Sequence, residues 1–178
     1  METNEGLGST DWEVFKADLR KMALDAPGRA ELFEKIGKRF LNLPGIVLVW
    51  VGLIDREGRT VIPIYEAGPC GAYLDQNKFT FDETVYGAGP TGRAIKTRLP
   101  AVLNDVADDP DYIPWREKAK TFGFASTAAL PFWTSGNLTG VLNLYSTQQR
   151  AFTEEVQKRL GEITCLIAEC SVHIQDPK

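Results

Sequence analysis

The longest apolar run of the chain, from Ile46 to Ile54, constrains the fold most strongly. The run is rich in β-branched and aliphatic residues and is short, so it predicts a strand that is covered on both faces. A DREG turn follows, and Val61 to Glu66 is the expected hairpin partner. Pro63 cannot donate a backbone hydrogen bond, which places this second strand at a sheet edge or a bulge. The run is about half the roughly 20 residues that a membrane-spanning helix needs.

Amphipathic helices are predicted on both sides of this hairpin. Apolar residues recur at spacings of three and four in two segments before it and in one long segment from Thr153 onward. Asp11 or Thr10 can cap the first helix, and Pro44 with Gly45 ends the second. The apolar positions are Trp12, Phe15, Leu19 and Met22, then Leu32, Phe33, Ile36, Phe40 and Leu41, and finally Val156, Leu160, Ile163, Ile167, Cys170 and Ile174.

The segment from Tyr86 to Ser146 offers a small-molecule pocket without an obvious catalyst. Glycines surround Pro90 and lead into a short helix from Thr91 to Thr97, which Thr91 can cap. A long loop follows. Two β-prone runs, Ser126 to Trp133 and Leu138 to Ser146, are separated by a predicted hairpin turn over residues 134–137. No dinucleotide fingerprint or Walker lysine accompanies the glycines, so we interpret them as turn geometry.

Composition limits the partners. A chain of 178 residues is about one domain long, and a net charge of -4 with a pI near 5.1 gives no basic stripe for a nucleic acid. The N-terminal sequence METNEGLGSTDWE is acidic where a secretory signal is basic, so no export and no membrane partner are predicted. The odd number of cysteines, Cys70, Cys165 and Cys170, fits a reducing cytoplasm.

The residues that usually carry catalysis or bind metals are few. The single histidine, His173, is near the C-terminus, so a Ser-His-acid site, a haem ligand in the pocket and a zinc cage are all unsupported. Four acids, Asp105, Asp108, Asp109 and Asp111, are close in sequence but lack the spacing of a calcium loop, and a solvated acidic loop is the favoured interpretation. The prediction is that the chain has no metal site and no catalytic residue.

Several motifs together resemble the GAF family of small sensory and ligand-binding modules. They are GPTGRAIKT, LNDV, PWREKA, GFAST and LTGVLNLYS, with AFTEEVQKRL opening the final helix. The resemblance is close from Leu43 to Ala168. It implies an α+β fold, in which an antiparallel sheet of about five to six strands has the N- and C-terminal helices on one face and a ligand-pocket region on the other. It also implies a division into an N-terminal helix, residues 1–28, that serves dimerisation, and a GAF domain, residues 29–178.

The resemblance and the distribution of aromatic residues suggest which side chains bind the ligand. Ligand pockets are mostly apolar with a few placed polar groups. The predicted liners are Trp50, Tyr86, Asp105, Trp115 and Ser126, chosen by their position in the implied fold. Each aromatic residue taken singly fits an ordinary core position equally well. Asp105 has the alternative role of capping its own loop turn.

Three functions follow from the resemblance. The preferred one is a non-catalytic regulatory module, similar to those ahead of bacterial diguanylate cyclases, phosphodiesterases and histidine kinases, that binds an unidentified small molecule. It implies a homodimer through the terminal helices, with simple packing against the sheet as the alternative. It also implies either an output domain beyond Lys178, which the apolar stripe of the final helix favours, or a stand-alone regulator. The cofactor is unknown, and we predict that the chain is not an enzyme.

The other two functions fit the sequence less well. One GAF branch reduces free methionine sulfoxide with cysteines, and this chain has Thr91 where that branch has a cysteine in the glycine motif. A cyclic-nucleotide receptor is the third function. In such receptors, the Asn-Lys, Phe and Asp-Glu elements of the binding motif are far apart in the sequence. In this chain the similar residues are contiguous, in NKFTFDE at residues 77–83, and cannot take the same geometry.

Overall fold

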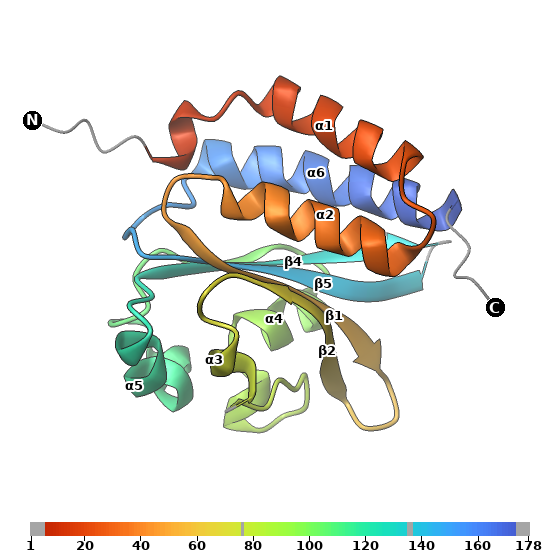
Figure 1. Cartoon of the computed structure of the whole chain (residues 1–178). Helices are drawn as coiled ribbons and strands as arrows, with labels where there is room; N and C mark the ends of the chain where they lie inside the picture. Colours follow the sequence, from red (N-terminus) through yellow and green to blue (C-terminus); the bar gives the residue numbers. More distant parts are fainter. Residues whose placement is uncertain (1–5, 76, 135–136, 174–178) are drawn as a thin grey trace, which may run out of the picture.

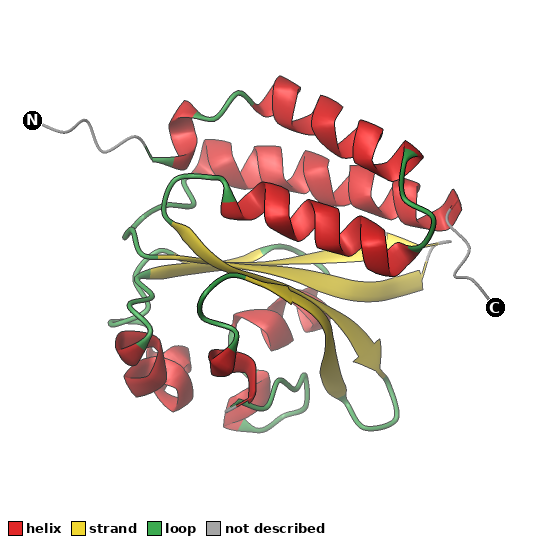
Figure 2. Ribbon diagram, viewed as in Figure 1, coloured by secondary structure: helices red, strands yellow, loops and turns green. Residues whose placement is uncertain are grey.

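The computed structural model describes residues 6–75, 77–134 and 137–173. These residues form one antiparallel sheet with helices on both of its faces, as Figures 1 and 2 show. The strand order is β2-β1-β5-β4-β3. The predicted α+β class and the placement of the terminal helices on one face are therefore confirmed.

The sheet follows the predicted strands closely. Its strands are β1 (Ile46–Asp55), β2 (Thr60–Ala67), β3 (Ala101–Leu103), β4 (Ser126–Thr134) and β5 (Asn137–Ser146). Strand β2 lies at the edge, and the register between β1 and β2 shifts opposite Pro63 and Tyr65, as expected for a proline that cannot donate to the ladder. Strands β4 and β5 pair antiparallel, although the centre of the predicted turn, residues 135–136, lies outside the described residues.

Three long helices cover one face, here called the helix face. They are α1 (Trp12–Leu24), α2 (Arg29–Leu41) and α6 (Glu154–His173), and α1 packs on the other two (Figure 1). Asp11 caps α1 by accepting a hydrogen bond from the backbone N–H of Val14 at 3.1 Å, as predicted. Most positions of the predicted stripes are buried, and Phe15, Leu32 and Leu160 have no exposed surface. Met22, Leu41 and Cys170 are partly buried. Ile174, the last residue of the predicted stripe on α6, lies outside the described residues.

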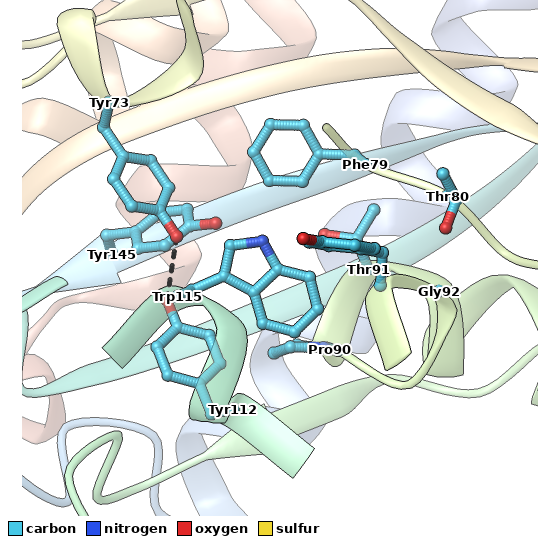
Figure 3. Close-up of a pocket in the computed structure, with 11 residues that line it drawn as sticks. Tyr73, Phe79, Thr80, Pro90, Thr91, Gly92, Tyr112, Trp115 and Tyr145 are labelled. Atoms are coloured by element: carbon cyan, nitrogen blue, oxygen red, sulfur yellow. Dashed lines mark hydrogen bonds between the residues drawn. The ribbon is translucent and has the colours of Figure 1, made fainter. Parts of the chain in front are cut away.

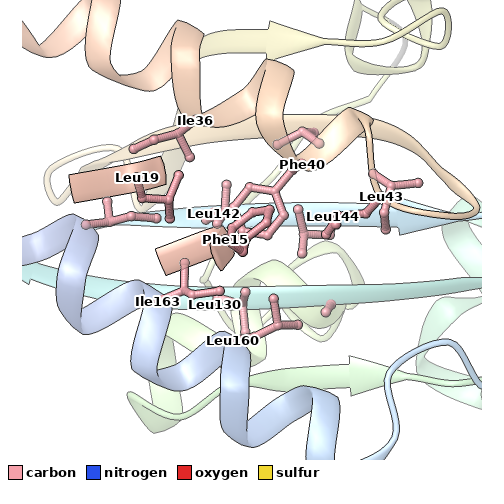
Figure 4. Close-up of a cluster of buried hydrophobic side chains, with 14 of the residues drawn as sticks. Phe15, Leu19, Ile36, Phe40, Leu43, Leu130, Leu142, Leu144, Leu160 and Ile163 are labelled. Carbon is pink, nitrogen blue, oxygen red and sulfur yellow. The ribbon is translucent and has the colours of Figure 1, made fainter. Parts of the chain in front are cut away.

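The core of the helix face is mainly aliphatic, with several phenylalanines. Phe15, Phe40 and Leu160 interdigitate with Leu130, Leu142 and Leu144 of the sheet (Figure 4). The rings of Phe15 and Phe40 meet edge to face at 4.9 Å. This cluster explains why α1 is held to the domain rather than free in solution.

The other face, here called the pocket face, carries shorter elements. They are α3 (Ala72–Asp75), the 3-10 helices Val85–Gly87 and Pro110–Tyr112, α4 (Pro90–Thr97) and α5 (Ile113–Thr121). We predicted a long loop between the helix that ends at Thr97 and the strand that begins at Ser126, and the structure shows that part of this segment is the helix α5. Only two of its residues, Trp115 and Ala119, are buried, so no apolar stripe marks it in the sequence.

Among the described residues, no helix is both long and apolar enough to cross a membrane. Within the same part of the chain, no three His, Cys, Asp or Glu side chains are grouped so that they could hold a metal ion.

Candidate functional site

The pocket face contains a small cavity between the sheet, α4 and α5, here called the aromatic cavity. Figure 3 shows its walls. Six aromatic rings, two threonines and the first turn of α4 line it. The lining residues are Tyr73, Phe79, Thr80, Tyr86, Gly89, Pro90, Thr91, Gly92, Tyr112, Trp115 and Tyr145. The free space is about 10 Å³, which is room for one water molecule.

The glycines let the backbone segments around the cavity approach one another. A Cβ added at Gly92 would lie 2.4 Å from the carbonyl oxygen of Gly87 and 2.5 Å from that of Thr80. A Cβ at Gly89 would lie 2.5 Å from Cη2 of Trp115. The glycine motif therefore serves close packing of α4 against its neighbours, rather than turn geometry as predicted.

Thr91 does not cap α4 as predicted, because the helix begins one residue earlier. Gly89 is the N-cap, and Pro90 stands in the first turn, where its missing N–H costs nothing. The hydroxyl of Thr91 instead donates a hydrogen bond of 2.8 Å to Oδ1 of Asn143 on β5. Asn143 is 1% exposed, and its Nδ2 has no hydrogen-bond acceptor among the described residues. A buried unpaired donor costs about 1–3 kcal/mol, so this Nδ2, which lies behind Thr91, is an unusual feature of the pocket face.

Three buried tyrosines give the cavity its polar character. The hydroxyls of Tyr73 and Tyr112 are 3.1 Å apart and hydrogen bonded, as Figure 3 shows. The ring of Tyr145 packs against that of Tyr73 at 5.4 Å. Burial raises the pKa of Tyr145 to about 12, and it raises the pKa values of Tyr73 and Tyr112 well above 10. All three hydroxyls therefore stay protonated at neutral pH and can donate or accept.

Two of the five predicted site residues line the cavity. Trp115 is 4% exposed, and its indole contacts the ring of Tyr86 edge to face at 6.1 Å. Tyr86 is 47% exposed and lies at the mouth. Trp50 lies one layer deeper, because its ring packs on Phe79 at 4.5 Å and Phe79 is the residue that reaches the cavity.

The other two predicted residues lie outside the cavity. Asp105 accepts hydrogen bonds from the backbone N–H of Ala107 at 3.0 Å and from Nε2 of Gln149 at 2.8 Å, so it caps its own turn. Ser126 donates to the carbonyl oxygen of Gln148 at 2.6 Å. Its place in β4, two residues before Ala128, puts it on the helix face. The cavity thus gives no support to a binding role for either residue.

Sequence reasoning missed most of the wall. Tyr73 on α3 and Tyr145 on β5 are far apart in the sequence, and the structure brings their rings together. The alternation of side chains along β5 could have revealed Tyr145. Val141, Asn143 and Tyr145 share one face of the strand, and Leu142 and Leu144 lie on the other.

The three cysteines divide between the two faces. Cys70 packs against the pocket-face cluster, and burial raises the pKa of its thiol. Cys165 is exposed on α6, and Cys170 packs partly against the helix-face core. The described part of the chain holds all three as free thiols.

Comparison with known proteins assigns the family. A model described as GAF domain matches residues 27–169. The chain belongs to the GAF family, as its motifs predicted. The comparison with curated proteins gave no match.

Solved structures share the fold at low sequence identity. The GAF domain of PtsP from Coxiella burnetii is 16% identical with a TM-score of 0.75, and the match covers 92% of this chain and 94% of that one. The structure of fRMsr from Staphylococcus aureus with its substrate is 17% identical with a TM-score of 0.74, covering 94% and 99%. Free methionine-R-sulfoxide reductase from Neisseria meningitidis with its substrate is 20% identical with a TM-score of 0.73, covering 96% of each chain.

These comparisons contradict the prediction that the chain is not an enzyme. Two of the solved structures that share its fold over nearly the whole chain are reductases with substrate bound. At this level of identity the likeness shows the fold. A GAF fold is therefore no argument against catalysis.

Proposed function

We propose that this GAF domain is a regulatory module that binds a small molecule in the aromatic cavity. One observation carries the proposal: buried aromatic rings and protonated hydroxyls converge with the first turn of α4 around a single point of the pocket face. Binding sites for small molecules are concave and mostly apolar with a few placed polar groups, and this wall has that composition.

The sheet offers a path from the cavity to the terminal helices. Tyr145 lines the cavity, while its neighbour Leu144 packs in the helix-face core with Leu160 of α6 and Phe15 of α1. A ligand that shifts β5 would move both side chains, because they lie on one backbone. We propose that ligand binding is passed to α1 and α6 through β5.

Release of bound small molecules from the purified protein tests the binding role. The native protein is denatured and the supernatant is examined by mass spectrometry, next to Gly89→Ala and the control Gly8→Ala. A Cβ at Gly89 narrows the cavity, whereas a Cβ at Gly8 meets nothing within 4 Å. We expect a released molecule from the native protein and from Gly8→Ala, and a reduced amount from Gly89→Ala. Equal release from all three would contradict binding in this cavity.

A second candidate is a reductase for free methionine sulfoxide. It is favoured by the two substrate-bound reductases that match 94% and 96% of this chain. The reaction converts the sulfoxide and two thiols into methionine, a disulfide and water. Cys70 is the cysteine on the pocket face, although its raised pKa leaves little thiolate at neutral pH.

An assay with methionine sulfoxide and dithiothreitol tests this candidate. Turnover that is lost in Cys70→Ser and kept in Cys165→Ser would support it, because Cys165 is exposed on the opposite face. Methionine formation no faster than with dithiothreitol alone would eliminate it.

We also propose a homodimer through α1 and α6. Val14 is 52% exposed and Leu24 is 87% exposed on α1, so apolar surface remains there after α1 has packed on its own domain. Most of the α1 stripe is used within the chain, since Trp12, Phe15 and Leu19 are buried. Light scattering decides the question, and a monomeric mass at high concentration would contradict the dimer.

A further inference from the structure

The wall of the aromatic cavity carries no charge. None of its eleven residues has an acidic or basic side chain, and burial raises the pKa values of Tyr73, Tyr112 and Tyr145, so these three hydroxyls stay protonated at neutral pH. A charged group buried without a partner loses its hydration, which is costly. The chemistry of the wall thus suits an uncharged ligand.

The space for a ligand is filled by one side chain of the protein. The indole of Trp115 lies between Tyr112, whose ring is 5.6 Å away, and Tyr86, whose ring is 6.1 Å away. Its Cη2 reaches the first turn of α4 beside Gly89. Figure 3 shows the indole in the middle of the wall. With only about 10 Å³ left, any organic ligand must displace a lining group.

The helix that carries this indole is held less firmly than the opposite wall. Helix α5 buries two of its nine residues, whereas α4 buries five of its eight. The contacts that hold this region include a hydrogen bond from Nζ of Lys118 to Asn77 at 3.4 Å and the one between Tyr112 and Tyr73. They also include ion pairs of Arg93 with Asp109 at 3.9 Å and with Asp111 at 3.5 Å, whose side chains are all at least partly exposed. Pairs of this kind contribute little.

An unused hydrogen-bonding group lies behind the wall, next to Thr91. Asn143 Nδ2 is buried without an acceptor among the described residues, and its amide is held by Thr91, which lines the cavity. A ligand oxygen that reached this amide would satisfy it. Asn143 and Trp50 occupy paired positions on β5 and β1, so this donor belongs to the floor of the pocket face.

From these features we propose that the ligand is an uncharged, planar aromatic molecule of about the size of indole, with a hydrogen-bond-accepting oxygen, and that it takes the place of the Trp115 indole. The proposal rests on the proposed function of the aromatic cavity. The side chain that fills the cavity in this structure is itself planar, uncharged and aromatic, so it defines the shape that the wall accepts. Outward movement of α5 would carry the indole away.

Calorimetry with three matched probes tests the ligand class. They are oxindole, which is neutral with a carbonyl acceptor, indole, which is neutral without one, and indole-2-carboxylate, which is anionic. We expect oxindole to bind about tenfold more tightly than the carboxylate because the wall offers no counter-charge. Trp115→Ala should bind oxindole about tenfold more tightly than the native chain, since no indole must leave. Trp12→Phe, on the helix face, should bind like the native chain.

Fluorescence supplies a second readout that does not need the alanine variant to fold. Oxindole should change the tryptophan emission of the native chain and not that of Trp115→Phe. Tighter binding of indole-2-carboxylate, or oxindole binding that leaves the Trp115 emission unchanged, would overturn the proposal.

The same titrations separate this proposal from the proposed function. If cyclic GMP or methionine sulfoxide changes the Trp115 emission and oxindole does not, the ligand class is wrong and the binding role stands. If the native chain also releases no small molecule and no probe affects Trp115, both fail.

Discussion

The two faces of the sheet are built from different chemistry. The helix face packs leucine, isoleucine, valine and phenylalanine from three long helices into a continuous core. The pocket face packs tyrosines and tryptophans from the sheet and from short elements. Its wall contains hydroxyls, and behind it Nδ2 of Asn143 has no acceptor among the described residues. The helix face is therefore optimised for stability. The pocket face leaves hydrogen-bonding capacity and a helix, α5, that buries only two of its residues.

The largest expected effect is on the helix face. Phe15→Ala removes a ring with no exposed surface that contacts Phe40 and Trp12, and such truncations cost about 3–5 kcal/mol. Chemical denaturation should show this loss of unfolding free energy. Val14→Ala, at an exposed position of the same helix, should change it by less than about 0.5 kcal/mol. Similar losses in both variants would contradict the assignment of α1 to the core.

Two glycine substitutions test whether α4 needs a glycine to pack closely against the neighbouring backbone of the pocket face. Gly92→Ala should cost about 1–3 kcal/mol, because its Cβ would meet two backbone carbonyl oxygens that cannot rotate away. Gly161→Ala, in α6, meets nothing within 4 Å and should stabilise by about 0.5–1 kcal/mol. Thermal unfolding of the two variants should therefore shift in opposite directions. Shifts of the same sign would refute the packing role of Gly92.

Substitution of two buried threonines compares how much a threonine hydrogen bond contributes to stability on each face of the sheet. Thr91→Val leaves the whole amide of Asn143 unpaired and should cost about 1–2 kcal/mol. Thr164→Val on α6 removes a hydroxyl that donates to the carbonyl oxygen of Gly161 in its own helix, so about 0.5 kcal/mol is expected. Denaturation of both variants measures the difference. Equal costs would show that Asn143 does not depend on Thr91.

The smallest expected effect on the free energy of unfolding at neutral pH comes from ionisation of the buried tyrosines. This effect becomes larger at alkaline pH. The pKa of Tyr145 is about 12 in the folded chain against 10 in the unfolded chain, because burial disfavours the phenolate. Between pH 10 and 12 the unfolded state therefore binds fewer protons, and stability falls as pH rises. Tyr145→Phe should lessen this fall and leave the slope near neutral pH unchanged. An unchanged alkaline slope, measured by denaturation across this range, would contradict the burial of Tyr145.

The sequence predicted the helix face better than the pocket face for a physical reason. Phe15, Leu32 and Leu160 belong to stripes with a period near 3.6, which records a buried helix directly. Trp115 and Tyr112 stand in a segment without such a stripe, so α5 was predicted as loop. Ser126 was misplaced because the face that a strand residue takes depends on register, and a shift of one residue exchanges the faces.

The sequence by itself determined the family, the α+β class, the edge position of β2 and the helices that cover one face. These features follow from local periodicity, from the missing N–H of proline and from motifs in a fixed order, all of which can be recognised in the sequence itself. The tertiary structure alone decided the aromatic cavity. Thr91 meets Asn143 and Tyr73 meets Tyr112 and Tyr145 across long stretches of sequence. No local pattern encodes such contacts, because they depend on how separate elements pack over the sheet.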